Sequence, residues 1–70
     1  MAKYRIINGI TNLPTDIIVD AYQADKDTDV VWGEYAMRAH RGDYVITYSD
    51  GDKDVYKPEV FKNAFELVKD

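Results

Sequence analysis

The sequence predicts a small, mainly β protein of the α+β class. We expect an antiparallel sheet or an SH3-like partial barrel of four to five strands, followed by a short C-terminal helix. Runs of aromatic and β-branched residues such as Tyr44–Tyr48 alternate with turn residues, which is typical of strands. Ten of the 13 acidic residues are Asp, which is poor in helix interiors and good in turns. After Pro58, Phe61 and Phe65 have the spacing of a short helix.

Length and charge limit what the chain can do. Seventy residues with a net charge of −4 predict a single domain over residues 1–70, and so short a chain buries only about 60% of its unfolded surface. The lack of cysteine excludes disulfides and thiolate metal sites. We expect no signal peptide and no membrane span, which needs ~20 apolar residues. The negative charge argues against direct binding to nucleic acid or anionic membranes, which need basic patches.

The chain is expected to begin with a strand and an irregular loop. Lys3–Ile7 alternates like a strand, and Asn8-Gly9 is a turn signal. In the loop that continues to Pro14, we expect Ile10 and Leu13 to point inward.

Asp16–Ala24 is ambiguous, because its periodicity fits a helix or a strand. Thr15 could cap a helix. The run Ile17-Ile18-Val19 favours a strand, because β-branched side chains are stiff at χ1. We therefore predict a strand.

The middle of the chain is predicted to be an acidic loop and one strand. Asp25–Asp29 reads Asp-Lys-Asp-Thr-Asp, an exposed loop. Val30–Arg38 alternates as a single strand in which Gly33 marks a bulge. Its two faces would hold Val31, Tyr35 and Met37 on one side and Trp32, Glu34 and Arg38 on the other. Ala39–Gly42 then turns the chain.

Asp50-Gly51 predicts a β-hairpin, because both central residues of a type I′ turn need positive φ. A two-residue turn there pairs Tyr48 with Lys53, Ile46 with Val55, Val45 with Tyr56 and Tyr44 with Lys57. Both faces at the base of this hairpin would be apolar.

Lys57-Pro58 ends the hairpin and begins a helix that we place at Pro58 to about Ala64. Proline suits the first helical position, and Glu59 lies near the positive end of the helix dipole. Phe61 and Phe65 fall one turn apart, and Phe61 is expected to cover the hairpin.

Three patterns resemble functional sites, but structure alone explains each. Asp25, Asp27 and Asp29 alternate like the start of a calcium loop, without the required Gly and Glu. His40 is the only histidine and is expected in a surface turn. Arg41-Gly42-Asp43 spells a receptor-binding tripeptide that turn chemistry explains. We therefore expect no catalytic residue, metal or cofactor.

The strongest candidate for a working surface lies in Asp16–Glu34, which holds six acidic residues and one lysine. Aromatic side chains anchor interfaces, and charges steer encounter. The candidate partner-binding residues are Asp25, Asp27, Asp29, Trp32, Glu34 and Tyr35. A merely solvated loop and the hairpin tip at Asp50–Asp54 are the alternatives.

Several stretches resemble small bacteriophage and prophage proteins of unknown function, the PGDYG-type proteins. The resemblance rests on Gly42-Asp43-Tyr44-Val45-Ile46, Asp50-Gly51-Asp52, Lys57-Pro58-Glu59-Val60-Phe61 and Phe65-Glu66, with Ile18-Val19-Asp20-Ala21-Tyr22-Gln23 near the start. It covers about half of the chain; Arg41 and Phe65 replace the usual proline and tyrosine. The resemblance implies a phage origin and a strand at Asp16–Ala24, but no activity.

These observations favour a non-enzymatic phage accessory protein that binds and inhibits or redirects a host protein. The host protein could be a defence nuclease of the CRISPR or restriction type, reached in the cytoplasm of an infected bacterium. The alternatives are a minor virion or assembly protein and, least favoured, a small enzyme. An open sheet edge and many aromatic residues also predict a homodimer.

Overall fold

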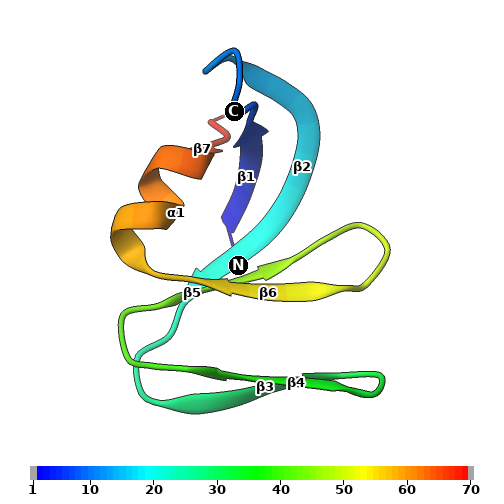
Figure 1. The fold of residues 1–70 in the computed structure, drawn as a ribbon, viewed down its shortest axis with the longest axis vertical. Coiled ribbons are helices and arrows are strands. Elements are labelled where there is room, and N and C mark those ends of the chain that lie inside the picture. Colours follow the sequence, from blue (N-terminus) through cyan, green and yellow to red (C-terminus); the bar gives the residue numbers. More distant parts are fainter. Residues whose placement is uncertain (1, 70) are drawn as a thin grey trace.

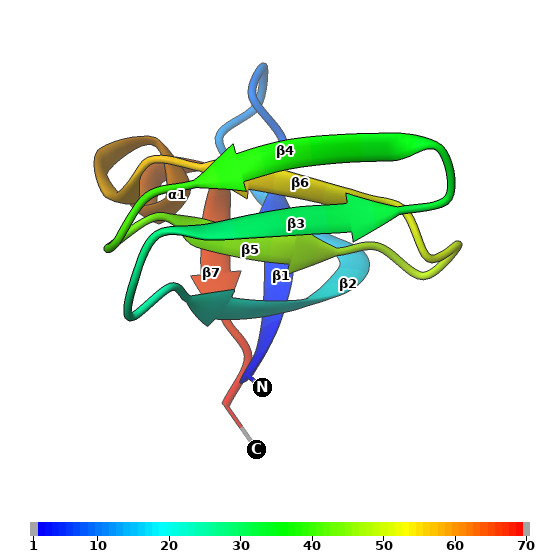
Figure 2. The same ribbon diagram turned by 90° about the horizontal axis from the view of Figure 1, so that it is seen from below.

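The computed structural model describes residues 2–69 as two antiparallel sheets and one short helix (Figures 1 and 2). The elements are β1 (Ala2–Ile7), β2 (Pro14–Gln23), β3 (Thr28–Trp32), β4 (Tyr35–Ala39), β5 (Tyr44–Thr47), β6 (Lys53–Tyr56), α1 (Pro58–Ala64) and β7 (Phe65–Leu67). The larger sheet has the order β6-β5-β2-β1-β7, and β3 and β4 form the smaller one. The predicted mainly β fold with a short C-terminal helix is confirmed, but the described residues form seven strands rather than four to five.

The ten-residue strand β2 connects the two parts of the larger sheet. It pairs with β1 from Pro14 to Ala21, and only its last four residues, Asp20–Gln23, pair with β5. Figure 1 shows β2 curving so that β1 and β7 run across the direction of β5 and β6. The sheet is strongly bent, and over residues 2–69 it does not close into a barrel. The strand predicted at Asp16–Ala24 is confirmed in type, at Pro14–Gln23.

Helix α1 covers one face of this bent sheet. Phe61 is buried in a cluster with Val19, Ala21, Ile46 and Phe65, and several half-buried tyrosines surround them. The Phe61 ring stacks on Tyr44 with 3.9 Å between ring centroids and an angle of 1° between the rings. Both the bounds predicted for the helix and the burial of Phe61 against the hairpin are confirmed.

A second apolar cluster lies on the opposite face of β5. There the β3–β4 hairpin covers the β5–β6 hairpin, as the side view of Figure 1 and the face view of Figure 2 both show. The buried residues between them are Ala24, Val30, Ala39 and Val45, with Trp32 and Val55 half-buried beside them. Strand β5 is therefore buried on both faces, with Val45 on one side and Ile46 on the other.

The register predicted for the β5–β6 hairpin is wrong by one residue. Gly51 N–H donates to the Tyr48 carbonyl and Tyr48 N–H donates to the Asp52 carbonyl, so three residues form the loop instead of two. Gly51 has a φ of 93°, as expected for a type I turn closed by a glycine bulge. The observed pairs are Tyr44 with Tyr56, Val45 with Val55, Ile46 with Asp54 and Thr47 with Lys53.

This shift exchanges the faces of β6. Tyr56, predicted to lie beside Val45, lies with Tyr44 and Ile46 in the cluster under α1, and Val55 joins Val45 in the second cluster. A one-residue slip moves every side chain of a strand to the other face. The predicted apolar character of both faces at the hairpin base is nevertheless confirmed.

The single strand predicted for Val30–Arg38 is also wrong, because the chain reverses at Gly33-Glu34. Strands β3 and β4 pair up to Trp32 opposite Tyr35. Gly33 has a φ of 54°, and Glu34 is not among the residues of positive φ, as in a type II′ turn with glycine at its first central position. Gly33 therefore makes a turn rather than a bulge. Trp32, Tyr35 and Met37 consequently share one face, and Val31 and Arg38 share the other.

Ile10 and Leu13 do not point inward, as the sequence predicted; they are 96% and 63% exposed. The Asn8 side chain organises this loop, because its Oδ1 accepts the N–H groups of Ile10 and Thr11 at 2.8 and 3.0 Å. These local bonds satisfy the loop's backbone without drawing its apolar side chains into the core.

Candidate partner-binding surface

The β3–β4 hairpin presents an aromatic pair at its end. Trp32 and Tyr35 are the last cross-strand pair before the turn, and their rings stack with 5.7 Å between centroids. Trp32 is half-buried against the second cluster, whereas Tyr35 is 64% exposed. The tryptophan therefore anchors the pair to the fold and the tyrosine presents it to solvent.

A shallow groove of about 300 Å³ separates this aromatic pair from the neighbouring hairpin tip. It is lined by Trp32, Tyr35, Asp52 and Lys53. Lys53 Nζ donates to Thr47 Oγ1 at 2.8 Å, across the β5–β6 pair. Further exposed acids lie in the turns of the two hairpins, Glu34 in one turn and Asp50 beside Asp52 in the other. We call Trp32, Glu34, Tyr35, Asp52 and Lys53 the aromatic end.

Three of the six sequence-predicted residues, namely Trp32, Glu34 and Tyr35, belong to the aromatic end. The other three lie elsewhere. Asp25 and Asp27 are exposed before the start of β3, and at 3.3 Å per strand residue the nearer one, Asp27, is roughly 16 Å along the chain from Trp32. Asp29 was predicted in a loop but lies in β3, on the face opposite Trp32.

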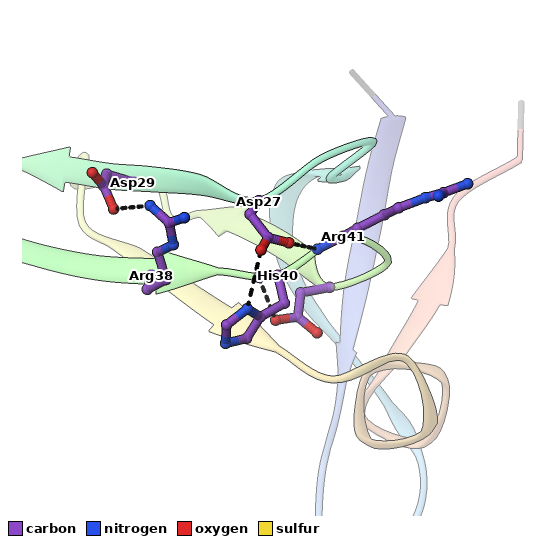
Figure 3. Close-up of polar contacts among 6 residues, drawn as sticks. Asp27, Asp29, Arg38, His40 and Arg41 are labelled. Carbon is purple, nitrogen blue, oxygen red and sulfur yellow. Dashed lines mark hydrogen bonds and ion pairs between the residues drawn. The ribbon is translucent and has the colours of Figure 1, made fainter.

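Asp27 has a clear structural role (Figure 3). Its Oδ1 accepts the backbone N–H of Arg41 at 2.9 Å, and its Oδ2 lies 3.8 Å from His40 Nδ1. The Arg41 N–H, with His40 and Arg38 nearby, holds the pKa of Asp27 below its ordinary value despite a smaller opposing effect of burial. Asp27 thus ties the loop before β3 to the turn before β5.

Asp29 is also engaged, because its Oδ1 lies 2.9 Å from Arg38 Nη1 across the hairpin (Figure 3). This pair is exposed and contributes little to stability. Arg38 nevertheless neutralises the charge of Asp29, which is one of the three aspartates predicted from the sequence to bind a partner. Of these three aspartates, only Asp25 makes no hydrogen bond or ion pair with another group of residues 2–69.

The turn before β5 uses the Arg41-Gly42-Asp43 tripeptide for backbone geometry. Asp43 Oδ2 accepts the His40 N–H at 2.9 Å, and Gly42 N–H donates to the Ala24 carbonyl. Gly42 has a φ of 94°, which favours glycine. His40 is exposed at the edge of this turn, as the sequence predicted.

The negative charge is concentrated in one part of the chain. Residues 25–56, which contain the two stacked hairpins, carry eight acidic and four basic side chains, whereas the remainder is balanced with five of each. The aromatic end therefore lies in the part of the molecule that carries the net charge of −4. Such a field attracts positively charged partners over about a Debye length.

Sequence reasoning missed the association of the two hairpins, although it had named the Asp50–Asp54 tip as an alternative to the acidic loop. The missing signal was Gly33. Glycine between Val-Val-Trp and Tyr-Ala-Met marks a two-residue hairpin as readily as a bulge. A hairpin there would have predicted Trp32 opposite Tyr35.

Clustered metal-ligand side chains and buried polar residues are both absent from the described residues. Residues 2–69 contain no group of three His, Cys, Asp or Glu side chains placed to hold a metal ion, and their buried residues are all apolar. Burial raises the pKa of Tyr48, helped by Tyr56 and the Asp54 carboxylate, which keeps this phenol neutral. The lack of a catalytic activity and of a cofactor stays a prediction.

Neither protein-family models nor curated proteins nor solved structures give a match to this chain. The resemblance to PGDYG-type phage proteins therefore stays a prediction. Across residues 2–69, no helix is long and apolar enough to cross a membrane.

Proposed function

We propose that the protein is a phage-encoded accessory protein that binds a host protein through the aromatic end. The observation that carries this proposal is the exposed Tyr35 ring, stacked on the anchored Trp32 beside a groove that Asp52 also lines. Aromatic anchors next to charged rims are typical of protein interfaces. The groove is shallow and open, which suits a protein surface better than a small molecule.

The acids at this end of the molecule favour a basic partner surface. Asp52 lines the groove, Glu34 and Asp50 are exposed in the turns of the two hairpins, and the net negative charge of residues 25–56 supports the same orientation. A basic surface of this kind exists where a nuclease holds the phosphates of nucleic acid. We therefore propose a host-defence nuclease, of the CRISPR or restriction type, as the partner in the bacterial cytoplasm. The protein would compete with nucleic acid for that surface.

The test combines capture and mutation. Wild-type protein is used to isolate its partner from host lysate, and affinity is then measured with both proteins purified. Tyr35→Ala should weaken binding by at least about tenfold, as expected for an aromatic anchor. Val31→Ala is the matched control, because Val31 is 63% exposed on the opposite face of the same hairpin, and it should leave affinity unchanged.

Charge and competition give independent readouts. The double variant Glu34→Lys, Asp52→Lys should slow association, and wild-type affinity should fall as salt rises. Duplex DNA or RNA should displace the protein from its partner. Asp25→Lys tests the loop predicted from sequence, and binding should not change. Equal affinities for Tyr35→Ala and Val31→Ala, or a partner that nucleic acid does not displace, would contradict the proposal.

A further inference from the structure

Arg5 in β1 carries a guanidinium group without a polar partner among residues 2–69. Its side chain is half-buried, and its Nε is buried with no hydrogen-bond partner, unlike every other buried side-chain nitrogen or oxygen of the described residues. None of the ion pairs within residues 2–69 includes Arg5. Buried polar groups ordinarily have partners, and a partly desolvated charge without one is costly. Arg5 therefore lacks the counter-charge that such a group needs.

The position of Arg5 in the sheet explains why it has no partner. Its neighbours in β1, Tyr4 and Ile6, pack against the cluster under α1, and side chains alternate faces along a strand, so Arg5 lies on the opposite face. In the register it stands between Ile18 of β2 and Glu66 of β7. Ile18 is uncharged, and the Glu66 side chain forms no ion pair with Arg5 although the two residues are directly opposite. The sheet therefore positions the guanidinium without neutralising it.

An open pocket of about 450 Å³ lies beside Arg5 and is lined by Arg5 and residues 66–69. The Val68 N–H donates to the Lys3 carbonyl at 3.0 Å, so the chain continues along β1 after β7 ends. Lys69 adds a second, exposed positive charge to the lining, and none of the ion pairs within residues 2–69 engages it. The pocket therefore contains two cations and one carboxylate. Its volume is in the range of small-molecule sites.

We propose that this pocket, which we call the Arg5 site, binds an oxyanion, namely the carboxylate or phosphate group of a small ligand. The planar guanidinium group matches both, because two of its N–H groups can bond two oxygens at once. Since Nε is buried, the ligand contacts the terminal Nη groups from the pocket, and Lys69 adds a second attractive charge. The anion neutralises a partly desolvated cation, which is worth more than the same contact at a fully hydrated arginine.

The surroundings of the Arg5 site tolerate an anion. The net charge of −4 arises from residues 25–56, and the rest of the chain is balanced. Of the carboxylates on neighbouring strands, Asp20 already pairs with Lys3 at 2.7 Å, and Glu66 is left as a competitor for Arg5. Figure 1 shows β1 and β7 in the upper part of the molecule and the β3–β4 hairpin in the lower part. The site is therefore separate from the aromatic end and stands or falls independently of the proposed host partner.

Anion titration followed by ¹H–¹⁵N NMR tests the site in the wild-type protein. Sodium phosphate should shift the Arg5 Nε–H signal and the Glu66 amide along one saturating curve in the millimolar range. Arg38 and Arg41, the other two arginines, are exposed internal controls whose Nε–H signals should not saturate. Sodium chloride at matched ionic strength should leave Arg5 unshifted. A parallel titration with sodium acetate tells whether the site prefers a carboxylate or a phosphate. If neither anion saturates Arg5, or if all three arginines respond alike, the proposal is wrong.

Three variants separate the Arg5 site from a structural ion pair. Arg5→Gln should abolish the saturable shift of the Glu66 amide, and Arg41→Gln is the matched control that should bind like the wild type. Arg5→Lys keeps the charge but loses the planar fork, so it should bind more weakly than wild type. Glu66→Gln removes the competing carboxylate and should tighten binding several-fold, with Arg5 Nε–H as the readout. Circular dichroism should show that each variant is folded. Weaker binding in Glu66→Gln, or a melting temperature lowered as much as in Arg5→Gln, would mean that Glu66 is the partner of Arg5 and would overturn the proposal.

Discussion

Phe61 makes more aromatic contacts than any other described residue. Its ring stacks on Tyr44 and Phe65 and meets Tyr4 edge-on, with 4.8 Å between centroids. These three rings come from β1, β5 and β7, so one side chain links three strands of the larger sheet to α1. Its location one turn into the helix follows from Pro58, which begins the helix and thereby sets which residue faces the sheet.

Phe61→Ala should reduce the free energy of unfolding by about 3–5 kcal/mol, because it removes a large buried ring and leaves a cavity. A domain of this size commonly has only about 3–5 kcal/mol in total, so the variant should be largely unfolded at 25 °C. Urea denaturation followed by fluorescence measures this. Val60→Ala on the same helix is the control, since Val60 is 49% exposed. An unchanged midpoint in Phe61→Ala would contradict the packing described.

Asp27 should make stability depend on pH. The Arg41 N–H holds its folded-state pKa below the ordinary value of 3.8. A carboxylate with a lowered folded-state pKa stabilises the fold above the unfolded-state pKa, and the stabilisation is lost as pH falls through the folded-state pKa. Asp27→Ala should therefore melt at a lower temperature than wild type at neutral pH, and the difference should narrow below pH 3.8. Asp25→Ala should match wild type throughout; a difference independent of pH would contradict this role.

At the scale of elements, two glycine turns determine which side chains meet. Gly33 reverses the chain so that Trp32 stacks on Tyr35, and Gly51 closes a three-residue loop that directs Tyr56 under α1. In both hairpins the loop length and turn type set the register, and the register then sets the faces.

Gly51→Ala should lower the free energy of unfolding by about 1–2 kcal/mol, because an L side chain disfavours positive φ. The φ of 93° at Gly51 lies in this region. In a domain of this size, each kcal/mol corresponds to about 4–8 °C in Tm. Gly9→Ala is the control: Gly9 is not among the glycines of positive φ, and an added Cβ would have open space. Equal melting temperatures for the two variants would argue against the three-residue loop.

At the scale of the molecule, the two apolar clusters share β5. Ile46 and Val45 are fully buried on its opposite faces, so neither α1 nor the β3–β4 hairpin packs independently of the other. We expect a single cooperative unfolding transition, as is usual for small domains. The same arrangement leaves six of the eight acidic residues within residues 25–56 exposed to solvent.

Metal ions should not affect this stability. Asp27 and Asp29, which give the acidic segment its resemblance to a calcium loop, are bonded to the Arg41 backbone and to Arg38. Thermal melts in EDTA and in millimolar calcium should therefore coincide. Magnesium at the same concentration controls for ionic strength. A calcium-specific rise of several degrees would show that these carboxylates rearrange around the ion.

Local chemistry in the sequence determined the type of most elements. The β-branched Ile17-Ile18-Val19 run specified a strand, and Pro58 specified the start of α1. The burial of Phe61 followed from helical spacing. These features depend on residues within a few positions of one another, so a single sequence is enough to predict them.

Tertiary structure decided what pairs with what. Asp50-Gly51 permits a two-residue or a three-residue loop, and the observed loop places Tyr44, Ile46 and Tyr56 together under α1. Strand β7 forms only because β1, some sixty residues earlier, offers an edge beside Phe65. Trp32 lines a groove together with Asp52 and Lys53 because one hairpin packs on another. Such contacts depend on residues far apart in the chain, and local propensity carries no information about them.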